Sequence, residues 1–371
     1  MVNFKILLNS LISNQKEGKL RKIVLAPLGL LSFFYGWAVL ARVFLYARGL
    51  LQTHSLPCRV VSVGNITLGG TGKTPFVSLL SEMIKARGYR VAILSRGYKG
   101  TFQKPFSLVS DGRRILMDTQ QAGDEPYLLA EKLEGVPVIV GKKRWLSGKY
   151  AVDHFQAQVV ILDDGFQHLS LKRDLNFLLI DSSSPFGNGY LIPRGVLREP
   201  LGQLSRADAI VLTKVGESAN VKILKENLKK IPGGYPCFQV DYVPDEIRWY
   251  DNENKSWPAE YMKRKKILAF SGLAKPESFR RTLLSLGAEI VTVETFPDHH
   301  WYSQRDAEKL WAKAAKFGVD ALVTTEKDLV KMQGLTLGSI PLWALSIRHF
   351  FSGNDQLKFE DFLFSRLGLG S

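Results

Sequence analysis

The sequence predicts an α/β fold: a doubly wound, mostly parallel sheet, a second and smaller α/β domain, and an apolar membrane-anchoring helix near the N-terminus. Three observations support this prediction. Short apolar, β-branched runs alternate with helix-length segments along most of the chain, as in parallel sheets. A glycine-rich turn connects one such run to a helix, and an uncharged stretch precedes both. The length of 371 residues is enough for two domains with cores of their own.

Residues 59–75 carry the strongest single signal. Val60, Val61 and Val63 predict a buried strand, and residues 76–84 predict a helix. The turn between them ends in Gly-Lys-Thr, which is the context of a phosphate-binding loop (P-loop), where main-chain N–H groups and a helix N-terminus surround a polyphosphate. Lys73 would reach the β- and γ-phosphates, and the Thr74 hydroxyl would bind Mg²⁺. The residues expected to contact the nucleotide are Gly64, Asn65, Thr67, Gly69, Gly70, Thr71, Gly72, Lys73 and Thr74.

This loop departs from the usual pattern at one position. A glycine is expected five residues before Gly72, where this sequence has Thr67, and the nearest earlier glycine is Gly64. The alternative is a glycine-rich turn that binds no ligand, but four glycines and Gly-Lys-Thr favour a nucleoside triphosphate.

Residues 213–215 begin the base clamp of GTP-binding proteins, yet Gly216 stands where that clamp needs Asp. We therefore expect ATP.

A second signal lies at residues 158–168, where four apolar residues lead into Asp163 and Asp164. This pattern predicts a buried parallel strand that presents two carboxylates at the sheet edge where α/β proteins bind ligands. In P-loop enzymes this strand end holds Mg²⁺, directly or through water. A capped strand end is the alternative, but two adjacent carboxylates beyond a buried run are costly without a cation.

The N-terminal part contains an uncharged run at residues 23–41. As a helix it would be roughly 28 Å long, against a hydrocarbon core of about 30 Å. Basic residues flank it on both sides, at positions 16–22 and at Arg42 and Arg48. It could span a bilayer, lie in its interface or form a buried core helix; we favour an anchor on the cytoplasmic face of the bacterial inner membrane, with basic residues on anionic headgroups.

The overall charge supports a polyanionic partner. Lysine and arginine number 50 against 35 acidic residues, which gives a net charge of +15. Zinc-finger spacing and RNA-binding aromatic motifs are absent from the sequence, so no nucleic acid is expected, and no obligate protein partner is evident. Cys58 and Cys237 are too few for a disulfide framework or a metal cluster, which fits a reducing compartment.

The remaining chain divides into further strands and helices. Asp124 lies where a helix N-cap would, so capping is the simplest interpretation of it. Residues 232–262 are rich in Pro, Gly, Tyr and Asp and predict a strand-rich linker, after which a second α/β run includes a helix at residues 304–317. We expect a membrane-associating segment at 1–55, a P-loop kinase domain at 56–235 and a C-terminal α/β domain at 236–371.

Together these motifs resemble the tetraacyldisaccharide 4′-kinase family, the lipid A 4′-kinases of Gram-negative bacteria. The displaced first glycine of the loop is also a feature of that family. The resemblance lies in residues 63–75, 95–98, 122–126, 163–168, 186–189, 197–199, 297–299 and 325–328.

The resemblance implies an enzyme that uses ATP and Mg²⁺ to phosphorylate the 4′-hydroxyl of an acylated disaccharide 1-phosphate in lipid A biosynthesis. Asp124 and His299 match the pair that takes the hydroxyl proton, with His299 either orienting Asp124 or sharing the proton. Arg144 and Arg198 match positions expected to meet phosphate, and Tyr98 matches one near the substrate. Glu199, beside Arg198 in the matching motif, is assigned to the substrate as well.

Two other classes of function compete with this one. A membrane-associated P-loop NTPase would hydrolyse nucleotide to switch a protein partner, and a membrane-tethered scaffold would bind ATP without any chemistry. The incomplete base clamp and the apolar N-terminal run argue against the switch.

Overall fold

The computed structural model describes residues 25–217, 221–229, 235–250 and 255–369. These residues form α helices and mostly parallel β strands, which confirms the predicted fold class. They divide into two compact units, each made of separated stretches of the chain: the described residues within 1–73, 148–241 and 351–371 form unit 1, and those within 74–147 and 242–350 form unit 2. The predicted domains are contiguous, and that linear division stays a prediction. Residues 1–24, with the basic positions 16–22, lie outside the described residues, as do parts of the predicted linker.

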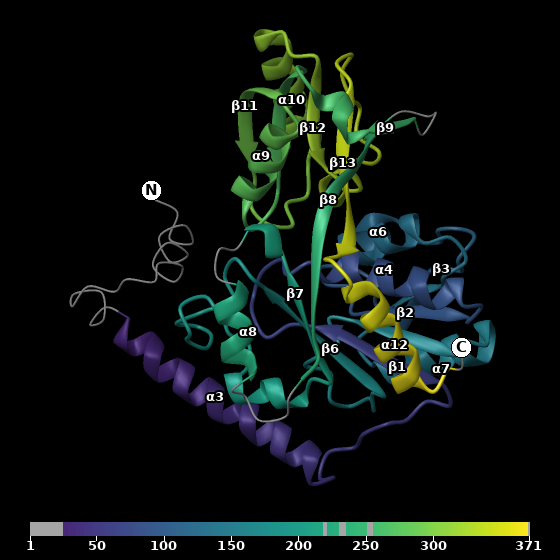
Figure 1. Ribbon diagram of the computed structural model, residues 1–371. Helices are drawn as coiled ribbons and strands as arrows, with labels where there is room; N and C mark the ends of the chain where they lie inside the picture. The colour runs from purple at the N-terminus through teal and green to yellow at the C-terminus, as the bar shows by residue number, and fades with distance from the viewer. Residues whose placement is uncertain (1–24, 218–220, 230–234, 251–254, 370–371) are drawn as a thin grey trace. The chain divides into compact units, whose positions relative to one another are not determined.

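Unit 1 contains a parallel sheet in which β1 lies between β5 and β6. β6 then pairs with β7, and β7 with the first residues of β8, also in parallel (Figure 1). Its elements are α3 (Ala26–Ala47), β1 (Arg59–Gly64), β5 (Val159–Asp163), β6 (Leu175–Asp181), η1 (Leu201–Arg206), β7 (Ala209–Thr213), η2 (Val215–Glu217), α8 (Val221–Lys229), α12 (Asp355–Leu367), most of α7 (Arg144–Phe155) and the start of β8 (Cys237–Trp249).

Apolar side chains cover both faces of this sheet, as expected for doubly wound strands. Leu178 and Ile180 of β6 belong to a buried cluster with Leu224 and Leu228 of α8. Phe177, which points to the other face, has its ring 5.2 Å from that of Phe359 on α12. The carboxyl ends of β1 and β5 therefore emerge from a rigid layer, and these ends carry the P-loop and the Asp163–Asp164 pair.

Unit 2 contains two groups of strands. β2 pairs in parallel with β4, which pairs antiparallel with β3. In the second group β10 lies between β11 and β12, β12 pairs with β13, and β8 pairs with β9. Its elements are α4 (Lys73–Ala86), β2 (Val91–Ser95), β3 (Phe106–Ser110), α5 (Thr119–Ala122), α6 (Asp124–Lys132), β4 (Val138–Gly141), β9 (Ser256–Pro258), η3 (Ala259–Met262), β10 (Lys266–Ser271), α9 (Pro276–Ser285), β11 (Glu289–Thr295), α10 (Gln304–Phe317), β12 (Ala321–Thr325), α11 (Glu326–Leu329) and β13 (Leu342–Phe351).

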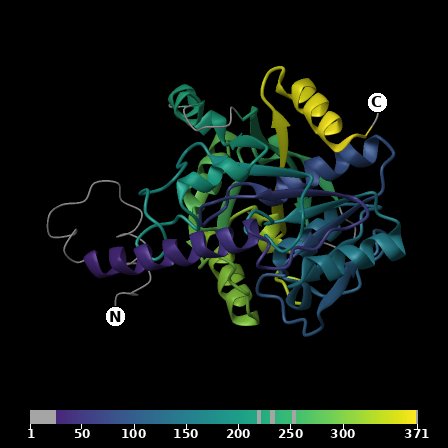
Figure 2. The same ribbon diagram turned by 90° about the horizontal axis from the view of Figure 1, so that it is seen from below.

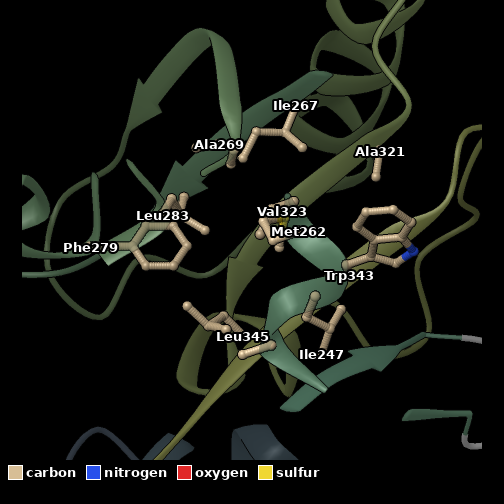
Figure 3. Close-up of a cluster of buried hydrophobic side chains, with 12 residues drawn as sticks. Ile247, Met262, Ile267, Ala269, Phe279, Leu283, Ala321, Val323, Trp343 and Leu345 are labelled. Atoms are coloured by element: carbon tan, nitrogen blue, oxygen red, sulfur yellow. The ribbon is translucent and has the colours of Figure 1, made fainter. Parts of the chain in front are cut away.

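Alternate residues of the second strand group face two different cores. Ile267 and Ala269 of β10 pack with Phe279 and Leu283 of α9, and Figure 3 shows these side chains converging. Leu268 and Phe270 face the opposite way, into a cluster with residues of α10. This layer fixes the loops at its carboxyl edge, which carry His299 and α11.

α3 is a single unbroken helix (Figures 1 and 2). Of the helices in the described part of the chain, it is the one long and apolar enough to cross a bilayer. The buried residues of α3 are small, Ser32 and Gly36, and they lie against the rest of unit 1. A Cβ atom at Gly36 would lie 2.8 Å from Leu191 Cδ1, so a larger residue there would require the Leu191 side chain to shift.

The large apolar side chains of α3 are exposed. Trp37 is 64% exposed and Phe34 60%. Leu30, Leu31, Phe33, Leu40 and Phe44 are also exposed. α3 is therefore not a buried core helix, and a contiguous apolar face of this size is typical of an interaction surface.

Candidate functional site

The glycine-rich loop has the conformation that a phosphate-binding loop needs. Gly69 and Gly72 have φ angles of 108° and 80°, which favour glycine. A Cβ atom at Gly69 or Gly70 would have no neighbour within 4 Å, so this side of the loop is open to a ligand. At Gly64 there is no room for a side chain, because a Cβ atom there would lie 2.6 Å from the main-chain nitrogen of Phe166.

Lys73 and Arg198 both bind Asp164. The Lys73 ammonium lies 3.5 Å from one Asp164 oxygen and donates a hydrogen bond of 3.3 Å to the Asn65 side-chain oxygen. One terminal nitrogen of Arg198 donates to both Asp164 oxygens, at 3.0 and 2.9 Å. Lys73 of the loop, Asp164 of the acid pair and Arg198 are therefore brought together within unit 1.

The charges around Asp164 set its protonation. Burial raises the pKa of this carboxyl, but the positive charges of Lys73 and Arg198 outweigh burial and hold the pKa below its usual value. Asp164 is therefore ionised at neutral pH. Its main chain has φ = 53°, an unusual conformation for a residue other than glycine.

Asp163 is the last residue of β5 and is buried, in register with Val63 of β1. Thr74 follows Lys73 in the first turn of α4. Two carboxylates and a hydroxyl are the hard oxygen ligands that Mg²⁺ prefers, so the chemistry of this donor set fits the ion. Within the described residues no group of three or more His, Cys, Asp and Glu side chains could hold a metal.

Other segments hold the loop in place. The Arg198 N–H donates to the Ile66 carbonyl at 2.7 Å, and the Leu68 N–H donates to the Val196 carbonyl at 2.7 Å. On the other side, the Thr213 hydroxyl donates to the Thr71 carbonyl and the Lys214 ammonium to the Gly70 carbonyl. The residues that resemble an incomplete base clamp thus support the loop, a role that the sequence did not indicate.

A second polar cluster lies within unit 2, around Asp124. His299 Nδ1 lies 2.7 Å from Asp124 Oδ2, as expected for the predicted pair. The Glu125 N–H donates to Asp124 Oδ1 at 3.0 Å. The N-cap of α6 is Gly123 and α6 begins at Asp124, so the prediction of Asp124 as the N-cap is wrong. Gly123, with φ = 90°, turns the chain there, and the Asp124 carboxylate binds His299.

Lys327 joins this cluster, although the sequence indicated no role for it. Its ammonium lies 3.2 Å from His299 Nε2, 3.3 Å from Glu125 Oε1 and 3.6 Å from Asp298 Oδ1. Burial raises the pKa of Asp124, but the hydrogen bond from His299 and the charge of Lys327 outweigh it, and the pKa lies below its usual value. Asp124 is thus a buried carboxylate, ionised at neutral pH.

The other predicted site residues have different surroundings. The exposed Tyr98 places its ring 5.4 Å from that of His299. Arg144 is buried at the start of α7, where its guanidinium donates to the Gly141 carbonyl at 3.3 Å. Glu199 is 1% exposed and its carboxylate binds Arg206. Burial raises the pKa of Glu199, although Arg206 opposes this. A contact of Glu199 with substrate stays a prediction.

Comparisons with known proteins agree on one family. The family model described as tetraacyldisaccharide-1-P 4′-kinase (LpxK) matches residues 22–367. The tetraacyldisaccharide 4′-kinase of Desulfatibacillum aliphaticivorans is 43% identical over 352 residues, which cover 93% of each chain. That of Syntrophus aciditrophicus is 43% identical over 324 residues, 85% of this chain and 86% of that protein. The crystal structure of LpxK from Aquifex aeolicus in complex with ATP has 33% sequence identity and a TM-score of 0.74, and the match covers 93% of this chain and 99% of that one.

Proposed function

The chain belongs to the tetraacyldisaccharide-1-P 4′-kinase (LpxK) family, and we propose that it transfers the γ-phosphoryl group of ATP to the 4′-hydroxyl of a tetraacyldisaccharide 1-phosphate in lipid A biosynthesis. The convergence of Lys73 and Arg198 on Asp164, beside a glycine loop with open space above it, carries this proposal. The names of the relatives and the ATP bound to the Aquifex aeolicus protein support it.

The P-loop of unit 1 would bind ATP through its main-chain N–H groups, with Gly69 and Gly70 allowing the phosphates to approach. Lys73 and Arg198 now neutralise Asp164. In the complex they would bind phosphate oxygens instead, and Asp164 would be released to a cation. The incomplete base clamp favours ATP over GTP, as the sequence predicts.

Asp163, Asp164 and Thr74 would hold Mg²⁺. A bound Mg²⁺ neutralises charge that develops on the β- and γ-phosphate oxygens. Arg144 and Arg198 are the arginines assigned to phosphate, since a guanidinium can bind two phosphate oxygens at once. Phosphoryl transfer consists mainly of positioning and charge neutralisation, and these side chains supply both.

Asp124 of unit 2 would accept the proton of the sugar hydroxyl, which is a poor nucleophile while it keeps that proton. Burial raises the pKa of Asp124, but the hydrogen bond from His299 and the charge of Lys327 outweigh burial and keep the carboxylate ionised for this task. Tyr98 lies against His299 and is exposed, so it would contact the sugar of the acceptor.

The exposed apolar face of α3 would lie in the bilayer interface on the cytoplasmic side of the inner membrane. Its small-residue face is occupied by unit 1, and therefore only the other face is available to lipid. Exposed Arg42 lies near the end of the helix and Arg48 follows it, where both cations would meet anionic headgroups. This placement would present the enzyme to a substrate whose acyl chains stay in the membrane.

ATP consumption with and without acceptor tests the proposed function against the alternative of an NTPase switch. We expect ADP release by the purified full chain to depend on a tetraacyldisaccharide 1-phosphate in mixed micelles. ADP release that is equally fast without any acylated sugar would favour the switch. A tetraacyldisaccharide 1-phosphate whose 4′-hydroxyl is chemically blocked serves as the matched negative acceptor.

A further inference from the structure

The carboxyl ends of β6 and β7 lie next to the second half of the P-loop. These two strands pair in parallel, with Asp181 opposite Thr213 at their last residues (Figure 1). The Thr213 hydroxyl donates to the Thr71 carbonyl at 3.0 Å, and the Lys214 ammonium donates to the Gly70 carbonyl at 3.1 Å. Two consecutive side chains therefore hold two consecutive carbonyls of the loop, and all of these residues belong to unit 1.

The Lys214 side chain is fixed by a contact of its own. Its ammonium also donates to Asp181 Oδ2 at 2.9 Å, and the side chains of this ion pair are only 13% and 6% exposed. The other Asp181 oxygen accepts a hydrogen bond of 3.0 Å from the Ser183 N–H. Lys214 has φ = 55°, a conformation that costs free energy in lysine and persists only where the surroundings determine it. The ammonium is therefore held at the Gly70 carbonyl.

The turn after Lys214 is anchored as well. The Gly216 N–H donates to Asp241 Oδ2 at 2.6 Å, and a Cβ atom at Gly216 would lie 2.8 Å from that oxygen. Residues 213–216 thus have the threonine and lysine that contact the loop, and they lack the carboxylate with which a base clamp selects guanine. The contacts with the loop are therefore separate from any selection of the base.

The geometry of the peptide bond converts these contacts into a direction for the next N–H groups. In a trans peptide the C=O of one residue and the N–H of the next lie in one plane and point opposite ways. With the Gly70 carbonyl held by Lys214, the Thr71 N–H points away from that side chain. With the Thr71 carbonyl held by Thr213, the Gly72 N–H likewise points away from β7. Within the described part of the chain, neither of these N–H groups donates a hydrogen bond.

Two further observations mark this half of the loop as a place for an anion. A Cβ atom at Gly70 would have no neighbour within 4 Å, so the loop is open there. The Thr71 hydroxyl is buried and has no hydrogen-bond partner among the described residues. A buried polar group without a partner costs free energy, which a ligand that accepts hydrogen bonds would recover. Two N–H groups and one hydroxyl are therefore available to phosphate oxygens.

We propose that Thr213 and Lys214 are positioning residues of the nucleotide site, which hold two loop carbonyls so that the following N–H groups face the phosphates of ATP. The inference rests on the ATP binding that is part of the proposed function, and it does not depend on the acceptor. Donors that are already aligned bind an anion without the free-energy cost of ordering the loop. Loss of either contact should weaken binding of the phosphates and leave contacts with the nucleoside unchanged.

Calorimetric titration of the full chain in detergent micelles, with Mg²⁺ and without acceptor, tests this proposal. The probes are ATP and inorganic tripolyphosphate, which has the phosphates and lacks the nucleoside. Thr213→Val removes the hydroxyl without a change of charge, and we expect both probes to bind about 3–10-fold more weakly. Thr213→Ser keeps a hydroxyl and should restore binding. Unchanged affinity of Thr213→Val, or a loss that Thr213→Ser does not reverse, would overturn the proposal.

Lys214→Met tests the second contact. Because this hydrogen bond has a charged donor, we expect ATP and tripolyphosphate to bind about 10–100-fold more weakly, by the same factor for both probes. A loss confined to ATP would mean that Lys214 binds the nucleoside, and it would overturn the assigned role.

Asp181→Asn separates the position of the ammonium from its charge. An amide offers one acceptor oxygen where Lys214 and Ser183 each use one, so Lys214 should be held less firmly. We expect both probes to bind more weakly to this variant, although the net charge near the loop becomes more positive. Tighter binding would mean that Lys214 acts on the phosphates through its charge alone, contrary to the proposal.

The matched control is Thr324→Val. The buried Thr324 hydroxyl of β12 also donates to a main-chain carbonyl, that of Phe270 at 2.9 Å, but it lies in unit 2. We expect this variant to lose thermal stability while both probes bind as to the natural chain, and a loss of affinity equal to that of Thr213→Val would contradict the proposal. If these binding results hold but the disaccharide is not phosphorylated, the proposed function fails and the positioning by Thr213 and Lys214 stands.

Discussion

The Tyr35 hydroxyl of α3 donates a hydrogen bond of 2.8 Å to the main-chain carbonyl of Arg198. A second bond from the same helix, 2.6 Å long, joins the Arg42 guanidinium to the carbonyl of Gln167. Arg198 binds Asp164, and the Gln167 side chain donates to the Asn65 carbonyl in the P-loop. α3 therefore holds the main chain at Arg198, which binds Asp164, and at Gln167, which contacts the P-loop.

Tyr35→Phe removes the hydrogen bond to the Arg198 carbonyl. Since a hydrogen bond contributes about 0.5–1.5 kcal/mol, we expect kcat/KM for ATP to fall up to about tenfold, with vesicle binding unchanged. Steady-state kinetics in mixed micelles measures this, with Tyr46→Phe on the same helix as the control. Equal kinetics for Tyr35→Phe and the natural chain would show that the Arg198 segment holds its position without α3.

Lys73→Ala removes the P-loop ammonium. We expect turnover to fall by about 10²-fold or more, because a donor aimed at developing phosphate charge is lost. Circular dichroism and the melting temperature should show an intact fold. The exposed Lys222 of α8 provides the control substitution Lys222→Ala. Near-normal transfer by Lys73→Ala would contradict the assignment of the loop.

Asp124→Asn tests the proton acceptor. The carboxamide keeps the shape but not the basicity, so kcat should fall by about 10²–10⁴-fold while KM changes little. Product formation under saturating ATP and acceptor measures the change. A variant with altered stability and unaltered kcat would mean that Asp124 only orders the start of α6.

The lowered pKa of Asp124 also predicts an acid dependence of stability. A carboxyl whose pKa is lower in the folded than in the unfolded chain stabilises the fold above its unfolded pKa of about 3.9, and this contribution is lost as pH falls through the folded value. Urea unfolding between pH 5 and pH 3 should therefore show a steeper loss of unfolding free energy in the natural chain than in Asp124→Asn. Parallel curves would speak against the lowered pKa.

The exposed aromatic side chains of α3 predict membrane binding. Replacing Phe33, Phe34 and Trp37 with serine removes surface that would enter lipid, at about 1.5–3 kcal/mol for each side chain. We expect at least a tenfold loss of binding to anionic vesicles in a flotation assay. Leu357→Ser, at a position on α12 that is 70% exposed, is the control. Unchanged binding of the triple variant would contradict the interfacial role of α3.

Much of the fold follows from local signals in the sequence. β5 is an apolar run as far as Asp163, and β1 has valine at residues 60, 61 and 63, a composition typical of buried parallel strands. The predicted helix at residues 304–317 agrees with α10, whose ends are set by a capping box at Ser303 and Asp306 and by a left-handed Gly318. The P-loop could also be predicted from a local signal, because all its residues are consecutive in the sequence.

The remainder depends on contacts between distant residues. The Pro, Gly and Asp content of residues 232–262 predicted a linker with strands, and its largest element is the 13-residue β8, which includes Pro244. Tertiary pairing overrides the weak strand propensity there. Asp124 and His299 are 175 residues apart, and only the family resemblance connected them. Lys327 lies in one of the motifs of the resemblance, residues 325–328, but that motif did not connect it to the Asp124–His299 pair, because a lysine after a strand has no pattern that distinguishes it from a solvated one.

The most direct test of the proposed kinase activity is to incubate the purified full chain with γ-labelled ATP, Mg²⁺ and a tetraacyldisaccharide 1-phosphate, and to locate the label in the product. We expect the label on the 4′-oxygen of the disaccharide, in an amount equal to the ADP formed. A glycolipid recovered unmodified, with the label in inorganic phosphate, would contradict the proposed function.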